Sequence, residues 1–134
     1  MKEEPKILLV DDDPDLIRAM RTILESQRYR VIPARNGLEA LDKVREEKPD
    51  LIVLDLLMPE LDGFGVCREL RGNPEYSEYS EIPILILTAV REEASRRRYE
   101  LETGRDLDAE DYIEKPVKPL LLLQRVAGIL DRAK

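Results

Sequence analysis

The sequence predicts an α/β fold in which five parallel strands form a sheet covered by helices on both faces. Short apolar runs alternate along the chain with stretches whose apolar residues recur at helical spacing, which is the pattern of repeated strand–helix units. The runs are apolar throughout rather than at every second position, as is typical of parallel strands buried on both sides. With 134 residues, the chain has the length of one domain, given roughly 100–200 residues per domain.

The elements follow one another in a regular order. The expected strands are residues 6–10, 31–34, 51–54, 82–88 and 112–114, and the expected helices are residues 14–27, 38–47, 64–70, 91–103 and 120–130. Asp13 and Pro14 form an N-cap followed by proline, which starts the first helix. Pro33 predicts an edge position for the second strand. Asn36-Gly37 and Asp62-Gly63 are turns that precede the second and third helices, and residues 72–81 are expected to form a polar loop.

Composition excludes several kinds of function. The chain carries 22 basic and 29 acidic side chains, a net charge of −7, which disfavours direct binding to nucleic acid or to anionic membranes. No apolar run approaches the roughly 20 residues of a membrane span, and residues 1–5 lack the apolar core of a signal peptide. The single cysteine, Cys67, is expected in the core and fits a reducing cytoplasm. Because histidine is absent, chemistry here depends on carboxylates, hydroxyls and lysine.

Polar side chains stand where the strands end. Acids at 11–13 follow the first strand, and Asp55, Thr88 and Lys115 follow the third, fourth and fifth. Because parallel strands end at one edge of the sheet, where such folds place their sites, these side chains are expected to converge. Helix capping explains Asp13 and Asp15. Taken singly, Thr88 suits a strand and Lys115 a solvated surface, but their joint placement favours a site.

The residue types at this edge suggest a chemistry. Crowded carboxylates call for a cation, and oxygen ligands alone suit Mg²⁺ rather than zinc. A metal beside a carboxylate, with a lysine and a hydroxyl opposite, can hold a phosphoryl group, and a carboxylate can be the nucleophile. The residues therefore indicate Mg²⁺-dependent phosphorylation of an aspartate.

Four segments, residues 7–13, 50–63, 84–89 and 112–116, together resemble the receiver domain of two-component response regulators. The resemblance extends from about residue 5 to about residue 131 and implies that residues 1–134 are a single receiver domain. It also implies a flavodoxin-like (βα)5 three-layer sandwich with strand order 2-1-3-4-5.

The resemblance assigns a role to each position of the site. It implies that Asp55 is the phosphoacceptor, and that Asp12, Asp55 and the backbone carbonyl of Leu57 bind Mg²⁺, or alternatively Mn²⁺. Asp11 is expected to act on the metal through water. Thr88 and Lys115 would hold the phosphoryl oxygens.

Further positions match the family as well. Ala89 would leave the site accessible, and the Lys115–Pro116 peptide is expected to be cis. Tyr112 matches the switch aromatic, whose ring is expected to turn inward as the Thr88 hydroxyl moves to the phosphoryl group. That motion would remodel the face made by helix four, strand five and helix five.

The family also implies partners. A sensor histidine kinase or a histidine phosphotransfer protein would donate the phosphoryl group, and an effector or downstream protein would respond, with a homodimer formed on phosphorylation as a further expectation. The chain would be a phosphoacceptor switch that promotes its own phosphorylation and dephosphorylation, not an enzyme acting on other substrates.

Some positions depart from the family. The segment 104–111 before Tyr112 is longer than usual and lies beside the output face, which puts the usual partners and dimer in question. Leu57 and Val90 are apolar where receivers often carry polar groups that orient water, which predicts a long-lived phosphoaspartate. The basic run 96–98 is interpreted as a solvated helix face.

Other functions remain open on the sequence. A receiver-like interaction module that never takes phosphate is the main alternative, although such modules usually lack one of the site residues. An aspartyl-nucleophile hydrolase of the dehalogenase-like class would use Asp11, but the chain leaves little room for a cap domain. A flavodoxin is the least favoured, because the acidic first loop would repel the FMN phosphate.

Overall fold

The computed structural model of the chain describes residues 4–58, 60–89 and 109–133. The expected helix at 91–103 and its basic run lie outside the described residues, as do Pro59, Val90 and residues 104–108. The elements of the described part are β1 (Lys6–Val10), α1 (Pro14–Glu25), β2 (Arg30–Ala34), α2 (Gly37–Glu47), β3 (Leu51–Asp55), α3 (Gly63–Gly72), the short 3-10 helix η1 (Pro74–Tyr79), β4 (Ile84–Thr88), β5 (Asp111–Glu114) and α5 (Pro119–Arg132).

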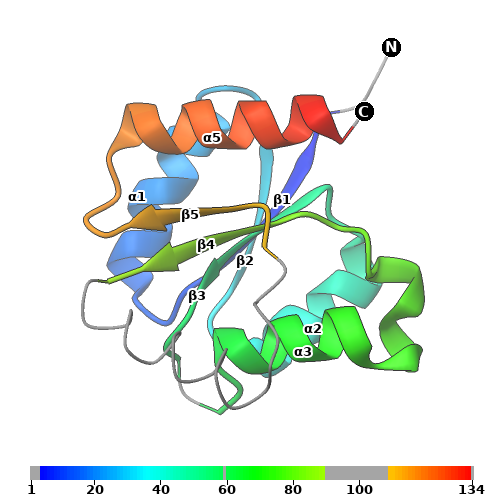
Figure 1. The fold of residues 1–134 in the computed structure, drawn as a ribbon. Helices are drawn as coiled ribbons and strands as arrows, with labels where there is room; N and C mark the ends of the chain where they lie inside the picture. Colours follow the sequence, from blue (N-terminus) through cyan, green and yellow to red (C-terminus); the bar gives the residue numbers. More distant parts are fainter. Residues whose placement is uncertain (1–3, 59, 90–108, 134) are drawn as a thin grey trace.

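The five strands form one parallel sheet in the order β2-β1-β3-β4-β5. Helices α1 and α5 cover one face and α2 and α3 the other, which makes three layers (Figure 1). This confirms the predicted flavodoxin-like α/β sandwich. Strand β2, which contains Pro33, lies at an edge of the sheet as predicted, because a residue without an N–H is tolerated there.

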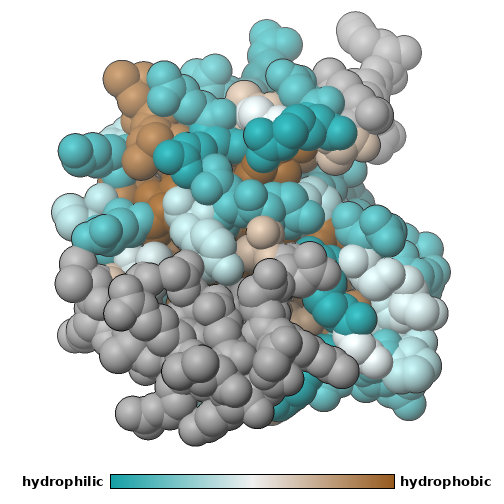
Figure 2. Space-filling model, viewed as in Figure 1, coloured by the Kyte–Doolittle hydropathy of each residue, from teal (hydrophilic) through white to brown (hydrophobic). Residues whose placement is uncertain are grey.

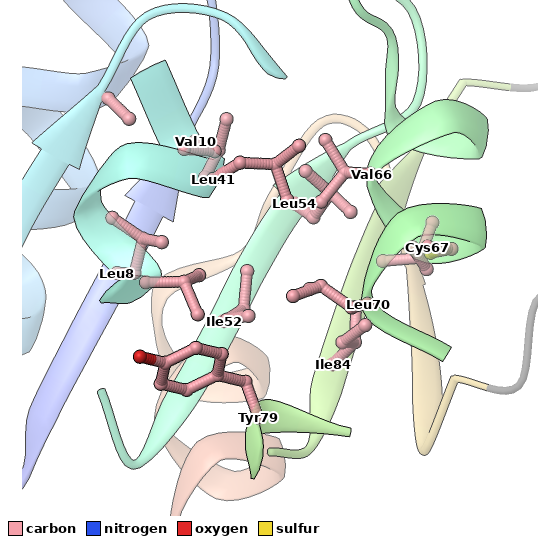
Figure 3. Close-up of a cluster of buried hydrophobic side chains, with 14 of the residues drawn as sticks. Leu8, Val10, Leu41, Ile52, Leu54, Val66, Cys67, Leu70, Tyr79 and Ile84 are labelled. Atoms are coloured by element: carbon pink, nitrogen blue, oxygen red, sulfur yellow. The ribbon is translucent and has the colours of Figure 1, made fainter. Parts of the chain in front are cut away.

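Alternate residues of the central strands enter opposite cores. Leu8 and Ile52 join the cluster beneath α2 and α3 (Figure 3), while Ile7 and Val53 join the cluster beneath α1 and α5. All five residues of β3 and of β4 are buried. Burying each large aliphatic side chain contributes about 1.5–3 kcal/mol. Packing on both faces of the sheet therefore stabilises the strands that carry the site.

Local signals place the helix starts. The Asp13 carboxylate accepts hydrogen bonds from the Asp15 and Leu16 amides and caps α1, as predicted. Asn36 caps α2 and Asp62 caps α3 through their side chains. Each cap satisfies amides that have no partner within the helix.

The expected polar loop at 72–81 is partly wrong, because residues 74–79 form η1. Tyr76 and Tyr79 are buried in this turn, and the Arg45 guanidinium lies 4.4 Å from the centre of the Tyr76 ring. The polar residues of this segment favoured a loop in the sequence, but Tyr76 and Tyr79 are spaced so that both rings face the core. The strand expected at 82–88 begins only at Ile84, after Pro83.

The surface agrees with the composition, in which 38% of the residues are charged. Figure 2 shows a largely hydrophilic face, with hydrophobic atoms gathered over the start of α5, where Leu120 is 74% exposed. Cys67 is buried in the core, as expected. Among the described helices, none is long and apolar enough to cross a membrane.

Candidate functional site: an acidic edge of the sheet

Three carboxylates meet at the carboxyl edge of the sheet. Asp11 and Asp12 follow β1, and Asp55 ends the neighbouring strand β3, where Val10 pairs with Leu54. One carboxylate oxygen from each acid lies within 4.8 Å of the others. Asp11 and Asp55 are 0% and 2% exposed, whereas Asp12 is exposed. The predicted convergence of these acids is therefore confirmed, and the set could hold a metal ion.

Asp11 is a buried acid, and one of its two carboxylate oxygens accepts no hydrogen bond from the described residues. Its Oδ1 accepts a hydrogen bond from the Asp13 amide at 3.0 Å. Its buried Oδ2 accepts no hydrogen bond from the described residues, although the Nζ of Lys115 lies 3.4 Å away, at ion-pair distance. Burial raises the pKa of the Asp11 carboxyl, and the Asp13 amide and the Lys115 charge offset this only in part. An oxygen in this state is suited to a cation.

Lys115, which directly follows the edge strand β5, brings a positive charge to the acids. Its Nζ donates a hydrogen bond to Oδ1 of Asp55 at 3.1 Å. Burial alone lowers the pKa of the Lys115 ammonium, but the charges of Asp11 and Asp55 outweigh it, so the pKa lies above its ordinary value. The amine is therefore charged at neutral pH. The Lys115–Pro116 peptide is cis, as predicted.

Thr88 closes the same edge from β4. Asp55 pairs with Leu87 across the β3–β4 ladder, so Thr88 stands one residue beyond the partner of Asp55. Its side chain is buried, and its hydroxyl donates to the carbonyl of the next residue, Ala89, at 3.2 Å. Its backbone carbonyl accepts a hydrogen bond from the Lys115 amide at 2.7 Å. The predicted hydroxyl and amine thus stand on adjacent, hydrogen-bonded strands.

Two more predicted residues lie around this edge. Leu57, two residues after β3, has an exposed side chain. Tyr112 lies in β5, half-buried, and packs against the core beneath α2 and α3. Its backbone carbonyl accepts a hydrogen bond from Arg125 of α5 at 3.3 Å. Tyr112 therefore connects the sheet edge to the outer helix layer.

The glycine of the predicted Asp62-Gly63 turn is required by a close backbone contact that the sequence alone does not reveal. A Cβ on Gly63 would lie 2.5 Å from the carbonyl oxygen of Asp55 and 2.8 Å from Cα of Leu56, and the Gly63 amide donates to the Leu56 carbonyl at 2.8 Å. The start of α3 therefore packs directly against the backbone of the central acid. Only a residue without a side chain fits there.

The donor set tests which metal the site fits. Its three acids offer oxygen alone, and one of these oxygens, Oδ2 of Asp11, is buried and accepts no hydrogen bond from the described residues. Hard, oxygen-seeking cations such as Mg²⁺ suit such a set, whereas zinc prefers nitrogen and sulfur. The residues present therefore fit a divalent cation of the Mg²⁺ type.

The fold and the acidic edge together define a class of protein, the flavodoxin-like α/β domains whose site lies at the carboxyl edge of the sheet. A family model of the response regulator receiver domain matches residues 7–127. The chain belongs to this family and is the receiver domain of a two-component response regulator.

Individual relatives also support membership of this family. The chain is 44% identical over 131 residues to the probable transcriptional regulator ycf27 of Porphyra purpurea, covering 98% of this chain and 49% of that protein. It is 43% identical over 129 residues to the alkaline phosphatase synthesis transcriptional regulatory protein PhoP of Bacillus subtilis, covering 96% and 50%. The crystal structure of a putative response regulator from Chloroflexus aurantiacus superposes with a TM-score of 0.82 at 32% identity, covering 96% of this chain and 99% of that one. The chain spans about half the length of the curated relatives it matches.

Proposed function

We propose that the chain accepts a phosphoryl group on Asp55 in a Mg²⁺-dependent reaction. The donor is a phosphohistidine of a sensor histidine kinase or of a histidine phosphotransfer protein. The observation that carries this proposal is the position of Lys115, whose Nζ lies 3.1 Å from Asp55 and 3.4 Å from Asp11. The Lys115 ammonium thus lies beside three acids that offer metal ligands. An ammonium group next to a metal-binding carboxylate cluster is an arrangement suited to phosphoryl transfer.

In the proposed reaction, an oxygen of Asp55 attacks the phosphorus of the donor. A bond forms between that oxygen and phosphorus, the bond from phosphorus to the imidazole nitrogen breaks, and the nitrogen keeps the electron pair. Asp12, Asp55 and the Leu57 carbonyl would hold Mg²⁺, with Asp11 acting through water, and the bound ion would supply positive charge to neutralise the phosphoryl oxygens. Mn²⁺ could take its place.

The remaining residues hold the product. The Lys115 ammonium turns from the free Asp55 carboxylate to a phosphoryl oxygen, which keeps its charge paired. The Thr88 hydroxyl leaves the Ala89 carbonyl and donates to another phosphoryl oxygen. The Tyr112 ring then moves inward and changes the outer face of β5 and α5. The chain acts in this way as a switch rather than as an enzyme on other substrates.

The wider role follows from that face. We infer that residues 1–134 form one receiver domain, placed in the cytoplasm, which controls an effector and pairs with a second copy on phosphorylation. The two relatives named above are described as transcriptional regulators, so a DNA-binding effector is the first candidate in the full-length protein. The receiver itself, with its net negative charge, is not the DNA-binding part.

Intact mass after incubation with Mg²⁺ and acetyl phosphate tests the proposal. The wild-type chain should gain the mass of one phosphoryl group, and this gain should vanish without Mg²⁺ and in Asp55→Asn. Asp42→Asn, which alters an exposed acid on α2, should gain the group as the wild type does. An unmodified wild-type chain that binds Mg²⁺ would instead indicate an interaction module, and loss of labelling in Asp11→Asn alone would indicate a hydrolase-like nucleophile.

A further inference from the structure

Glu110, just before β5, makes a two-way contact with the first residue of β4. Its backbone amide donates to the Ile84 carbonyl at 2.9 Å. In return, the Ile84 amide donates to the Glu110 carboxylate, Oε2, at 2.6 Å. Ile84 is fully buried, so this amide depends on a protein acceptor. One side chain therefore fixes where β5 begins along β4.

The same carboxylate is held from a second direction. Nη2 of Arg71, at the end of α3, lies 3.6 Å from Oε2 of Glu110. The Arg71 side chain is mostly buried, and its Nη1 also donates to the carbonyl of Ser80, which follows η1. We call Glu110, Arg71 and the Ile84 backbone the Glu110 clamp. The clamp joins α3 and the η1 segment to the start of β5.

The clamp and the phosphorylation site lie at opposite ends of one ladder. The pairing of β4 with β5 runs from Leu85 opposite Asp111 to Thr88 opposite Glu114, and the Lys115 amide adds the next hydrogen bond to the Thr88 carbonyl. β5 is a four-residue strand at the edge of the sheet. Its position therefore depends on few hydrogen bonds, of which the clamp supplies two.

We propose that Glu110 is a positioning residue of the phosphorylation site. By setting β5 along β4, it sets the distance from the Lys115 ammonium to Asp55. This inference rests on the proposed role of Asp55 as phosphoacceptor. The side chains that would bind Mg²⁺ follow β1 and end β3, and none comes from β5, so loosening the clamp slows phosphoryl transfer without weakening the binding of Mg²⁺.

The test compares Glu110→Ala with Glu110→Gln. The rate of phosphorylation by acetyl phosphate is measured at saturating Mg²⁺, and the Kd for Mg²⁺ is measured by calorimetry. Glu110→Ala should lower the rate about tenfold, because small misplacements of reacting groups are costly, while the Kd for Mg²⁺ does not rise. Glu110→Gln keeps an acceptor for the Ile84 amide and should restore most of the rate. Glu81→Ala, at an exposed acid before β4, should match the wild type.

Amide hydrogen exchange gives a readout that does not need phosphorylation. Glu110→Ala should speed exchange of the Lys115 amide and leave the Asp11 amide, which bonds to Ala34 at 3.1 Å, unchanged. If Glu110→Ala fails to fold, Glu110→Asp, which keeps the charge on a shorter side chain, should show the same contrast. Three results would overturn the proposal: an unaltered phosphorylation rate in Glu110→Ala, a loss of Mg²⁺ affinity in that variant, or an equal change in the exchange rates of the Lys115 and Asp11 amides. A wild-type chain that takes no phosphoryl group would refute the proposed function alone, since the exchange result still decides the clamp.

Discussion

The Nζ of Lys115 lies 3.1 Å from Oδ1 of Asp55, although 60 residues separate the two along the chain. The same Nζ lies 3.4 Å from Oδ2 of Asp11. One ammonium thus balances two carboxylates that are themselves withdrawn from water. In the absence of metal, this shared charge stabilises the acidic edge of the sheet, since a buried carboxylate without a cation is costly.

Replacing Lys115 should therefore destabilise the metal-free protein. Lys115→Met leaves Asp11 and Asp55 without their cation. The free energy of unfolding should fall by about 2 kcal/mol, below the roughly 3–5 kcal/mol for a fully buried ion pair because the lysine is partly exposed. Urea unfolding with and without Mg²⁺ measures this, and saturating Mg²⁺ should reduce the loss. Lys118→Met, at an exposed lysine three residues on, should have little effect. An equal loss in both variants would show that the shared charge is unimportant.

Mg²⁺ should stabilise the folded chain through the acids of β1 and β3. At a concentration of about 100 times its Kd, the ion should raise the free energy of unfolding by about 2.7 kcal/mol, and EDTA should remove this gain. Asp12→Asn deletes an exposed ligand and should lose most of the gain. Asp15→Asn, at the exposed acid that pairs with Arg18, serves as the control. Full stabilisation of Asp12→Asn by Mg²⁺ would exclude Asp12 as a ligand.

Two glycines should respond to alanine in opposite directions. At Gly63 the new Cβ would lie 2.5 Å from the Asp55 carbonyl, so Gly63→Ala should cost about 1–3 kcal/mol and slow phosphorylation by displacing Asp55. At Gly128, inside α5, nothing lies within 4 Å of a Cβ. Gly128→Ala should stabilise the chain by about 1 kcal/mol and leave phosphorylation unchanged. Thermal unfolding and mass labelling of both variants check this, and destabilisation by Gly128→Ala would contradict it.

The phosphoaspartate is expected to be long-lived. The Leu57 side chain is 40% exposed beside the site and offers no hydrogen bond to an attacking water. Leu57→Gln should shorten the half-life, because an amide can orient that water. Leu38→Gln, at an exposed leucine on α2, should not. Loss of the phosphoryl mass over time measures both, and a wild-type half-life of only seconds at neutral pH would refute the prediction.

Much of the fold could be predicted because its signals are local. Apolar runs, helical spacing and residues such as Asp13 and Pro33 act within a few positions of themselves, and the strands and helices confirm them. The prediction of a polar loop at 72–81 was partly wrong because Tyr76 and Tyr79 are buried against Arg45 and the core. Their polar neighbours in the sequence gave no sign of this contact. Residue type at the strand ends was enough to predict the acidic edge, and the metal, phosphoacceptor and switch roles stay predictions.

By itself, the sequence determined which chemical groups reach the edge of the sheet, since parallel strands all end on the same side. Only the tertiary structure decided how those groups differ. Asp11 and Asp12 are neighbours in sequence, yet in the turn that follows β1 one is fully buried and the other exposed. The sharing of Lys115 between Asp55 and Asp11, and the bond of Glu110 to Ile84, join residues from distant parts of the chain. Such contacts depend on strand order and packing, which bring together residues that no local pattern connects.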